Sequence, residues 1–167
     1  MSQHDLSPLT PADVQRALDA LGRGIVVRHY AESTATSELA AQAIGCEVGQ
    51  IAKSICLMLE DTRPILVVAS GDQRLDMKKV AALHSLSAKR VRMANAEECV
   101  ALYGYAPGGV PPLGHRHPPQ AVWLDEKLRR YAIIYAAAGS AQTIFPVATD
   151  DLPLLNGGRW ADVARDA

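Results

Sequence analysis

The chain has 167 residues, 49% of them hydrophobic, and no long low-complexity run, so it is long enough to bury the core of one domain, residues 1–167. A net charge of −1, from 17 Lys and Arg against 18 Asp and Glu, excludes a broadly basic nucleic-acid surface and leaves room only for a local patch. No stretch approaches the ~18 apolar residues of a membrane span and Met1–Thr10 is polar, so we expect a cytoplasmic protein without a signal peptide, a membrane partner or a DNA partner.

The first half of the chain alternates helix and strand signals. Thr10 and Gly22 mark the ends of the first helix, and Thr34 or Thr36 begins a second helix that Gly45 ends. Two strongly apolar strands follow and are expected at the centre of the sheet. The predicted helices are residues 10–22 and 34–45, and the predicted strands are residues 24–30, 50–60 and 63–71.

The second half continues the alternation. Asn95 and Glu98 form a capping box, and Gly104 ends the helix that they begin. Asp125–Lys127 is predicted as the turn of a hairpin between residues 120–125 and 130–139. The remaining elements are helices at 75–85, 95–104 and 150–156 and strands at 89–94 and 143–148. The fold class is therefore mixed α/β (α+β), a central mixed sheet or barrel surrounded by helices.

The thiols and imidazoles predict neither a disulfide framework nor a metal site. Cys46, Cys56 and Cys99 are odd in number, lack paired metal spacing, and are expected to be reduced. His115 and His117 could join Cys99 only in a spacing that suits no common metal site. We expect no metal and no cofactor.

Lys53 contradicts the pattern of its strand. Side chains alternate across a strand, so Lys53 shares a face with Ile51, Ile55, Leu57 and Leu59, the more hydrophobic face, and is predicted to point toward the core. A lysine there either extends out to solvent at the strand end or lines a cavity. Both interpretations stay open on this pattern alone.

The segment "GYAPGGVPPLGH", residues 104–115, raises the question of what a rigid loop is for. Its glycines and prolines are incompatible with a helix interior or a central strand. Adjacent glycines let a ligand approach backbone N–H groups closely, and prolines fix the loop in advance.

Four segments in order, "IAKSICLML", "VVASGDQRLDMKKVAAL", "AKRVRMANAEE" and "GYAPGGVPPLG", resemble the YbaK/EbsC family. That family includes the editing domain inserted in some prolyl-tRNA synthetases and the free-standing ProX-type deacylases. The resemblance spans about residues 30–164. It implies a hydrolase that removes the wrong amino acid from mischarged aminoacyl-tRNA in trans. It also implies that the partners are the tRNA acceptor end, often of tRNA for proline, and a synthetase.

The resemblance assigns roles residue by residue. Lys53 corresponds to the family's invariant lysine and Ser54 to its hydroxyl neighbour, and the glycine loop comprises Gly108, Gly109, Val110, Pro111, Pro112 and Gly114. N–H groups of Gly108 and Gly109 are expected to stabilise the ester's oxyanion, and the Lys53 ammonium to hold phosphate or ribose oxygens of the terminal nucleotide. By resemblance, the nucleophile is water or the substrate's own side chain.

Three positions depart from members that act on cysteinyl-tRNA. Pro111 replaces a serine, Ala137 lies near the position of another serine, and Ile144 lies near that of an aspartate. The pocket is therefore expected to be more apolar, which suits a small side chain such as alanine. An apolar pocket discriminates poorly against an added hydroxyl, so alanine, serine and cysteine stay open as the amino acid removed.

Other residues are candidates for contacts with tRNA. His115 is expected at the tRNA end, and Tyr30 aligns with an aromatic of the family pocket, where it stacks on a base or packs within its strand. A basic cluster is expected on the tRNA backbone, with ordinary solvated surface as the alternative: Lys78, Lys79, Lys89, Arg90 and Arg92. The alternative function is a module that binds a tRNA or nucleotide end without hydrolysis.

Overall fold

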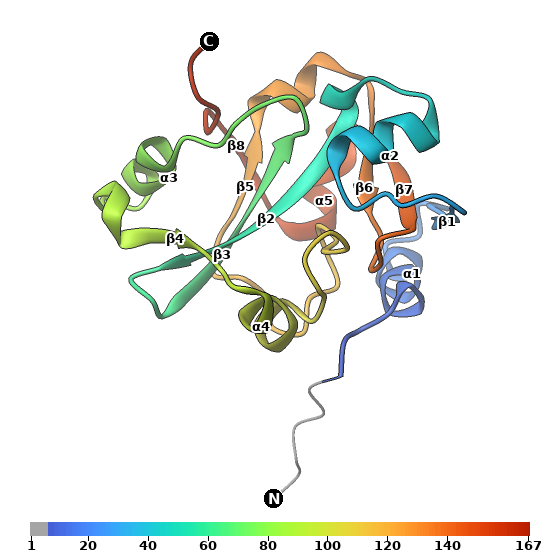
Figure 1. The fold of residues 1–167 in the computed structure, drawn as a ribbon, viewed down its shortest axis with the longest axis horizontal. Coiled ribbons are helices and arrows are strands. Elements are labelled where there is room, and N and C mark those ends of the chain that lie inside the picture. The colour runs from blue at the N-terminus through green and yellow to red at the C-terminus, as the bar shows by residue number, and fades with distance from the viewer. Residues whose placement is uncertain (1–6) are drawn as a thin grey trace, which may run out of the picture.

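The computed structural model describes residues 7–167, so most of Met1–Thr10 lies outside the described residues. One mixed sheet of eight strands runs through the molecule, with helices packed around it (Figure 1). Its strands are β1 (Arg28–His29), β2 (Ile51–Leu59), β3 (Arg63–Ser70), β4 (Val91–Met93), β5 (Val122–Asp125), β6 (Ile133–Ala137), β7 (Thr143–Ala148) and β8 (Arg159–Ala161). The helices are α1 (Pro11–Ala20), α2 (Ser37–Ile44), α3 (Met77–Leu83), α4 (Ala96–Glu98) and α5 (Leu152–Asn156). These findings confirm the predicted mixed α/β class.

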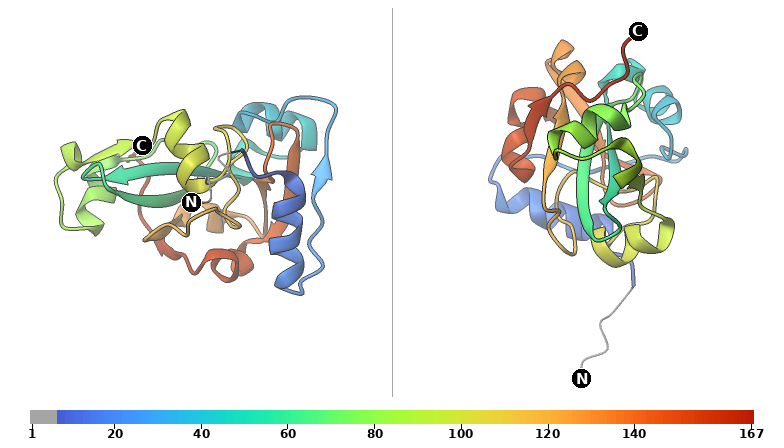
Figure 2. Two further views of the ribbon diagram at one scale, coloured as in Figure 1. Left: turned by 90° about the horizontal axis from the view of Figure 1, so that it is seen from below. Right: turned by 90° about the vertical axis from the view of Figure 1, so that its left-hand side faces the viewer.

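The antiparallel pair β2–β3 is the centre of the sheet, as predicted. Its register runs from Ala52 opposite Ser70 to Leu59 opposite Arg63. The strand order is β1-β7-β6-β2-β3-β5-β8, and β4 pairs with β2 outside this path. Figure 2 shows α1 at the end of the molecule near β1 and β7, and α3 at the opposite end.

Alternation along β2 feeds two cores. Ile55, Leu57 and Leu59 pack with Val80 and Ala81 of α3 in one cluster. The even-numbered side chains Ala52 and Cys56 belong to a second, larger cluster, which also holds Cys99. All three cysteines are free thiols.

Local sequence signals fix both ends of α2. Thr36, not Thr34, is the N-cap of α2, and its Oγ1 accepts a hydrogen bond from the Leu39 N–H at 3.1 Å. Gly45 ends the helix at φ +81°, in the left-handed conformation that glycine favours. Within residues 7–167, no helix is long and apolar enough to cross a membrane.

The predicted hairpin between residues 120–125 and 130–139 is wrong. β5 instead pairs in parallel with β3 and β8, whereas β6 forms its hairpin with β7. A 3-10 segment, Glu126–Arg130, separates β5 from β6. Asp125, predicted as a turn residue, is buried, and its carboxylate accepts hydrogen bonds from the N–H groups of Ser70 and Lys127.

Two other predictions at the sheet edges need correction. The predicted strand at 24–30 shortens to the two residues of β1, which pair with β7. The helix predicted at 150–156 forms as a 3-10 turn, Thr149–Asp151, and α5, but β8 follows it and was not predicted.

Candidate active site

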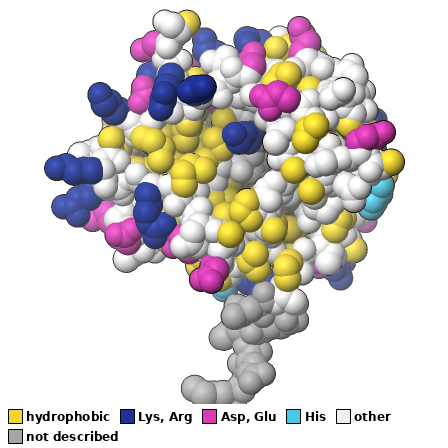
Figure 3. Space-filling view, viewed as in Figure 1, with side chains coloured by type: hydrophobic (Ala, Val, Ile, Leu, Met, Phe, Trp, Pro, Cys, Tyr) yellow, Lys and Arg dark blue, Asp and Glu magenta, His cyan; other side chains and the backbone are white. Residues whose placement is uncertain are grey.

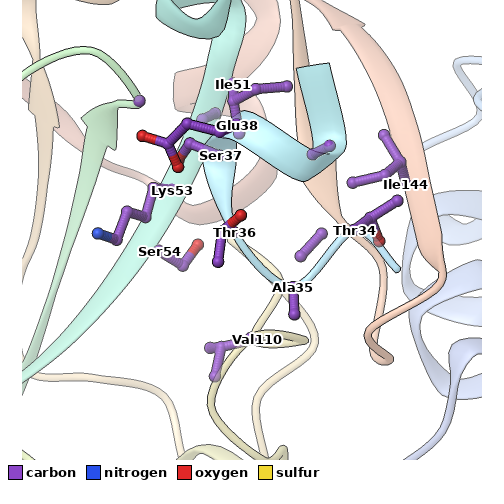
Figure 4. A pocket seen from close by; sticks show the side chains of 15 residues that line it. Thr34, Ala35, Thr36, Ser37, Glu38, Ile51, Lys53, Ser54, Val110 and Ile144 are labelled. Carbon is purple, nitrogen blue, oxygen red and sulfur yellow. The ribbon is translucent and has the colours of Figure 1, made fainter. Parts of the chain in front are cut away.

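A pocket of about 270 Å³ opens where the start of α2 meets β2 (Figure 4). Segments far apart in the sequence supply its wall. They are residues 34–38 and Ala40, residues 51–54, Gly71, Gly108, Val110, Ala137 and Ile144. Of the predicted site residues, the pocket brings together Lys53, Ser54, Gly108, Val110 and Ala137.

Lys53 lines this pocket but does not point into the core. Its side chain is exposed, because it lies between two clusters on this face of β2: the one beneath α3 begins at Ile55, and the other joins Ile51 to Ala40 and Ala41 of α2. Its ammonium makes no hydrogen bond or ion pair with any residue of the described chain. Figure 4 shows the Glu38 carboxylate and the Lys53 ammonium on the same side of the pocket. The lysine is therefore a cation available at the pocket mouth.

Two hydroxyl groups in the pocket are buried without a partner. The Oγ1 of Thr34 and the Oγ of Ser54 accept and donate no hydrogen bond among residues 7–167. Thr34 is 4% exposed, whereas Ser54 is partly exposed beside Lys53. A buried hydroxyl without a partner costs about 1–3 kcal/mol. Neither hydroxyl therefore has a role in the hydrogen bonding of the described fold.

The start of α2 gives the pocket further hydrogen-bond donors. N–H groups in the first turn of a helix have no partner within the helix, and Ser37 and Glu38 occupy that turn beside the pocket. Gly71 makes the close packing possible, since a Cβ there would lie 2.5 Å from the Val48 carbonyl oxygen and 2.8 Å from Ser37. The pocket thus combines polar donors with small apolar walls.

Arg130 forms an ion-paired network with the residues on either side of Gly71. The Arg130 guanidinium donates to Asp72 at 2.7 Å and to the Ser70 hydroxyl at 2.9 Å. The arginine's hydrogen bonds hold the pKa of Asp72 at about 2.

The two glycines of the loop have different roles. Gly108 lies at φ +91° and follows Pro107. The Gly109 N–H donates to the Ala106 carbonyl at 3.2 Å and closes a turn over these two residues. Gly108 therefore occupies the second central position of a type II turn. The Gly108 N–H makes no hydrogen bond with the described residues. Gly109, in contrast, does not line the pocket, and a Cβ there would lie 2.9 Å from the Ser140 backbone. In this structure the Gly109 N–H is used within the loop, and the absence of a Cβ there serves packing.

Side chains fasten the rest of the loop from outside the pocket. Tyr105 Oη donates to the Gly114 carbonyl at 2.8 Å, and Asn156 Nδ2 donates to the Pro112 carbonyl at 2.8 Å. His115 Nε2 lies 2.7 Å from the Pro111 carbonyl, which can only accept, and burial lowers the pKa of His115. Pro111, Pro112, Gly114 and His115 therefore belong to the support of the loop. His115, expected at the tRNA end, does not line the pocket.

Tyr30 packs within the fold. It lies against the cluster of Ala40, Ala41, Ile51 and Ile144, and its N–H donates to the Gln142 carbonyl at 2.8 Å. It does not line the pocket, so the structure favours the strand-packing interpretation.

The predicted basic cluster lies on the α3 and β4 side of the molecule. Figure 3 shows many Lys and Arg side chains there, with acidic ones among them. Lys79 pairs with Asp162 and Asp166, and Arg92 pairs with Asp61 and Glu98. Lys78, Lys89 and Arg90 are exposed and have no ion pair within the described residues. Of the five cations in the predicted cluster, these three remain available to a polyanion.

Sequence reasoning missed several pocket residues around the start of α2 and after β3. Thr34 and Thr36 were considered only as helix caps, and Ser37, Glu38 and Gly71 were not considered for the site. A helix start near a strand carrying an unpaired lysine was the available signal.

Among residues 7–167, no group of three or more His, Cys, Asp or Glu side chains could hold a metal ion.

Comparison with known proteins identifies the family. A sequence model of the aminoacyl-tRNA editing domain matches residues 31–154. The chain belongs to this family. The YbaK-type resemblance is thereby confirmed, and with it the prediction of an aminoacyl-tRNA deacylase.

Relatives of this aminoacyl-tRNA editing domain cover most of the chain. YwhH of Bacillus subtilis is 34% identical over 84% of this chain and 87% of its own. EbsC of Enterococcus faecalis, a candidate Cys-tRNA(Pro)/Cys-tRNA(Cys) deacylase, is 28% identical over 80% of each chain. The crystal structure of a candidate trans-editing enzyme for prolyl-tRNA synthetase is 37% identical, with a TM-score of 0.86 over 99% of this chain and 100% of that one.

The domain also resembles part of a much larger enzyme. In the proline–tRNA ligase of Shouchella clausii, a segment making up 23% of that protein is 28% identical to 81% of this chain.

Proposed function

We propose that the pocket holds the aminoacyl end of a mischarged tRNA and that its residues hydrolyse the ester between the amino acid and the terminal ribose. The observation that carries this assignment is the convergence of Lys53, Ser54, Gly108 and the start of α2 on one open pocket. Each group suits a part of such an ester.

Lys53 binds the nucleic-acid part of the substrate. An exposed ammonium without a partner is suited to a phosphate or to the ribose oxygens of the terminal nucleotide, and it favours the negative charge that develops during attack. Ser54, next to it on β2, is near enough to the same end of the pocket to contact the ribose or the ester.

Hydrolysis requires donors for the carbonyl oxygen. When water attacks the ester carbon, that oxygen becomes an anion, and the bond to the ribose oxygen then breaks to give free amino acid and tRNA with its hydroxyl restored. The Gly108 N–H and the first N–H groups of α2 are the donors that line the pocket. These groups are fixed before the substrate arrives, which lowers the cost of stabilising the anion.

The proposed partners are a tRNA and a synthetase. The substrate is mischarged tRNA, with tRNA for proline as the first candidate, because related segments occur within proline–tRNA ligases. We also propose that the enzyme works in the cytoplasm beside a synthetase, where the mischarged product is made. Lys78, Lys89 and Arg90 provide the charge for a limited contact with the tRNA backbone.

A panel of mischarged tRNAs tests this function. Deacylation is measured at fixed enzyme concentration for tRNA for proline charged with alanine, serine or cysteine, with correctly charged tRNA as the control. The proposal expects turnover of at least one mischarged species and none of prolyl-tRNA. Binding without turnover of any species would instead establish the non-catalytic module.

A further inference from the structure

The closed side of the pocket carries a polar group that neither the fold nor the proposed chemistry uses. Figure 4 shows Thr34 beside Ile144, across the pocket from Lys53. Thr34 is 4% exposed and Ile144 is 1% exposed, so this is a buried end of the pocket. The Thr34 Oγ1 has no hydrogen-bond partner within residues 7–167.

The backbone fixes the position of this hydroxyl. The Thr34 N–H donates to the Ala141 carbonyl at 2.6 Å, which ties the segment before α2 to the turn between β6 and β7. Thr34 does not cap α2, because Thr36 accepts the capping hydrogen bond. The hydroxyl therefore has no structural role that any contact of the described chain reveals.

Thr34 shares the pocket with apolar side chains. Ala40, Val110, Ala137 and Ile144 line it too, and Ile144 lies beside Thr34 (Figure 4). A buried hydroxyl loses its hydrogen bonds with water and regains one only when a ligand brings a polar group. A substrate side chain that ends in a methyl group, as in an alanyl ester, would leave the Thr34 hydroxyl without a partner.

We propose that Thr34 recognises a hydroxyl on the side chain of the amino acid to be removed, and that the preferred substrate is a seryl ester. This inference rests on the proposed function, with Lys53 at the nucleic-acid end and the opposite end left for the amino acid. It differs from the apolar-pocket expectation, which favours alanine. A cysteine thiol is a weaker donor and acceptor than a hydroxyl and satisfies Thr34 less well.

Selectivity follows from the same physical argument. A site with a buried polar group rejects an analogue that lacks the matching group far more strongly than an apolar site rejects an added hydroxyl. We expect kcat/KM for seryl-tRNA to exceed that for alanyl-tRNA by about 10-fold or more.

Two variants of Thr34 test the proposal on one tRNA charged with serine, alanine or cysteine. Thr34→Val replaces the hydroxyl by a methyl group and is expected to lower kcat/KM for the seryl ester by about 10-fold while leaving the alanyl ester unchanged. Thr34→Ser keeps the hydroxyl and is expected to retain the serine preference. Thermal unfolding of Thr34→Val should occur at the wild-type temperature or above, because the variant removes a buried group without a partner.

The contrary results are distinct. Equal losses on seryl and alanyl esters would place Thr34 against the α-amino group common to both and overturn the proposal. So would a wild-type enzyme that prefers alanine or cysteine, although the proposed function would then stand. A marked drop in melting temperature for Thr34→Val would show a structural hydroxyl and also overturn it. Absence of hydrolysis of every ester would instead refute the proposed function itself.

Discussion

Replacing Lys53 by alanine removes a positive charge from the pocket mouth without removing any contact that stabilises the fold. The side chain is exposed and has no hydrogen bond or ion pair with the described residues, so the free energy of unfolding should change by no more than about 0.5 kcal/mol. The effect should therefore appear in catalysis alone.

The size of the catalytic effect follows from Coulomb's law. An ammonium 4 Å from a phosphate or an oxyanion gains about 1 kcal/mol in water and about 4 kcal/mol at an effective dielectric constant of 20. The free lysine is in water, but a docked tRNA end displaces much of that water. An intermediate value of about 2.5 kcal/mol corresponds to a loss of roughly 10²-fold in kcat/KM.

Single-turnover deacylation at several salt concentrations measures both parts of this prediction. Lys53→Ala should lower kcat/KM by the expected factor and reduce its salt slope by about 0.7, the value for one contact with single-stranded nucleic acid. Arg159→Ala is the matched control, because Arg159 is an exposed cation on β8, the opposite edge strand from β1. Retention of wild-type turnover by Lys53→Ala, or loss of its cooperative thermal unfolding, would refute the assignment.

Three further predictions concern residues outside the pocket. Changing both Lys89 and Arg90 to alanine should weaken tRNA binding and reduce its salt slope by up to about 1.8 without altering kcat, and an unchanged slope in a titration would assign both residues to solvated surface. Gly109→Ala should lower stability by about 1–3 kcal/mol, because its Cβ would meet backbone at 2.9 Å, and a melting temperature equal to wild type would contradict this packing role. The hydrogen bonds from Arg92 hold the pKa of Glu98 at about 2, below its ordinary 4.5, so the pair stabilises the fold above about pH 4.5 and loses that contribution as the pH falls toward 2. Thermal melts should therefore show a stability gap between wild type and Glu98→Gln that closes on acidification, and a gap independent of pH would refute the coupling.

The central strands and the lysine were predictable because their signals are local. A run of apolar residues ended by turn residues marks β2 and β3, and alternation alone puts Lys53 on the face of Ile55 and Leu57. The direction of the lysine was not predictable. It depends on how α2 and α3 divide that face between them, which the sequence of β2 does not contain.

Strand partners were not predictable for a similar reason. Residues 120–125 and 130–139 have the pattern of two strands with a polar connection, which is typical of a hairpin. The sequence of a strand does not indicate which strand pairs with it in parallel. β5 pairs in parallel with both β3 and β8. Asp125 shows the consequence, since its carboxylate accepts a hydrogen bond from the Ser70 N–H at the end of β3.

The glycine loop shows how one sequence signal can have two physical causes. A Cβ is disfavoured at Gly108 because φ is +91°. A Cβ is disfavoured at Gly109 because the turn at Ser140 lies against its backbone. A positive φ and close packing both favour glycine, so the two adjacent glycines were predicted to share one role as oxyanion donors.

The packing of Gly109 connects the loop to the amino-acid end of the pocket. The Gly109 carbonyl accepts a hydrogen bond from the Gly139 N–H at 2.9 Å, and Ala141, in the same β6–β7 turn, accepts one from Thr34. The loop and the segment before α2 are thus held by one turn, and none of its residues 138–142 lines the pocket with Lys53. A change in that turn should therefore alter the position of Thr34 relative to Gly108, and with it the choice of amino acid, while leaving the contacts of Lys53 with the nucleic acid in place.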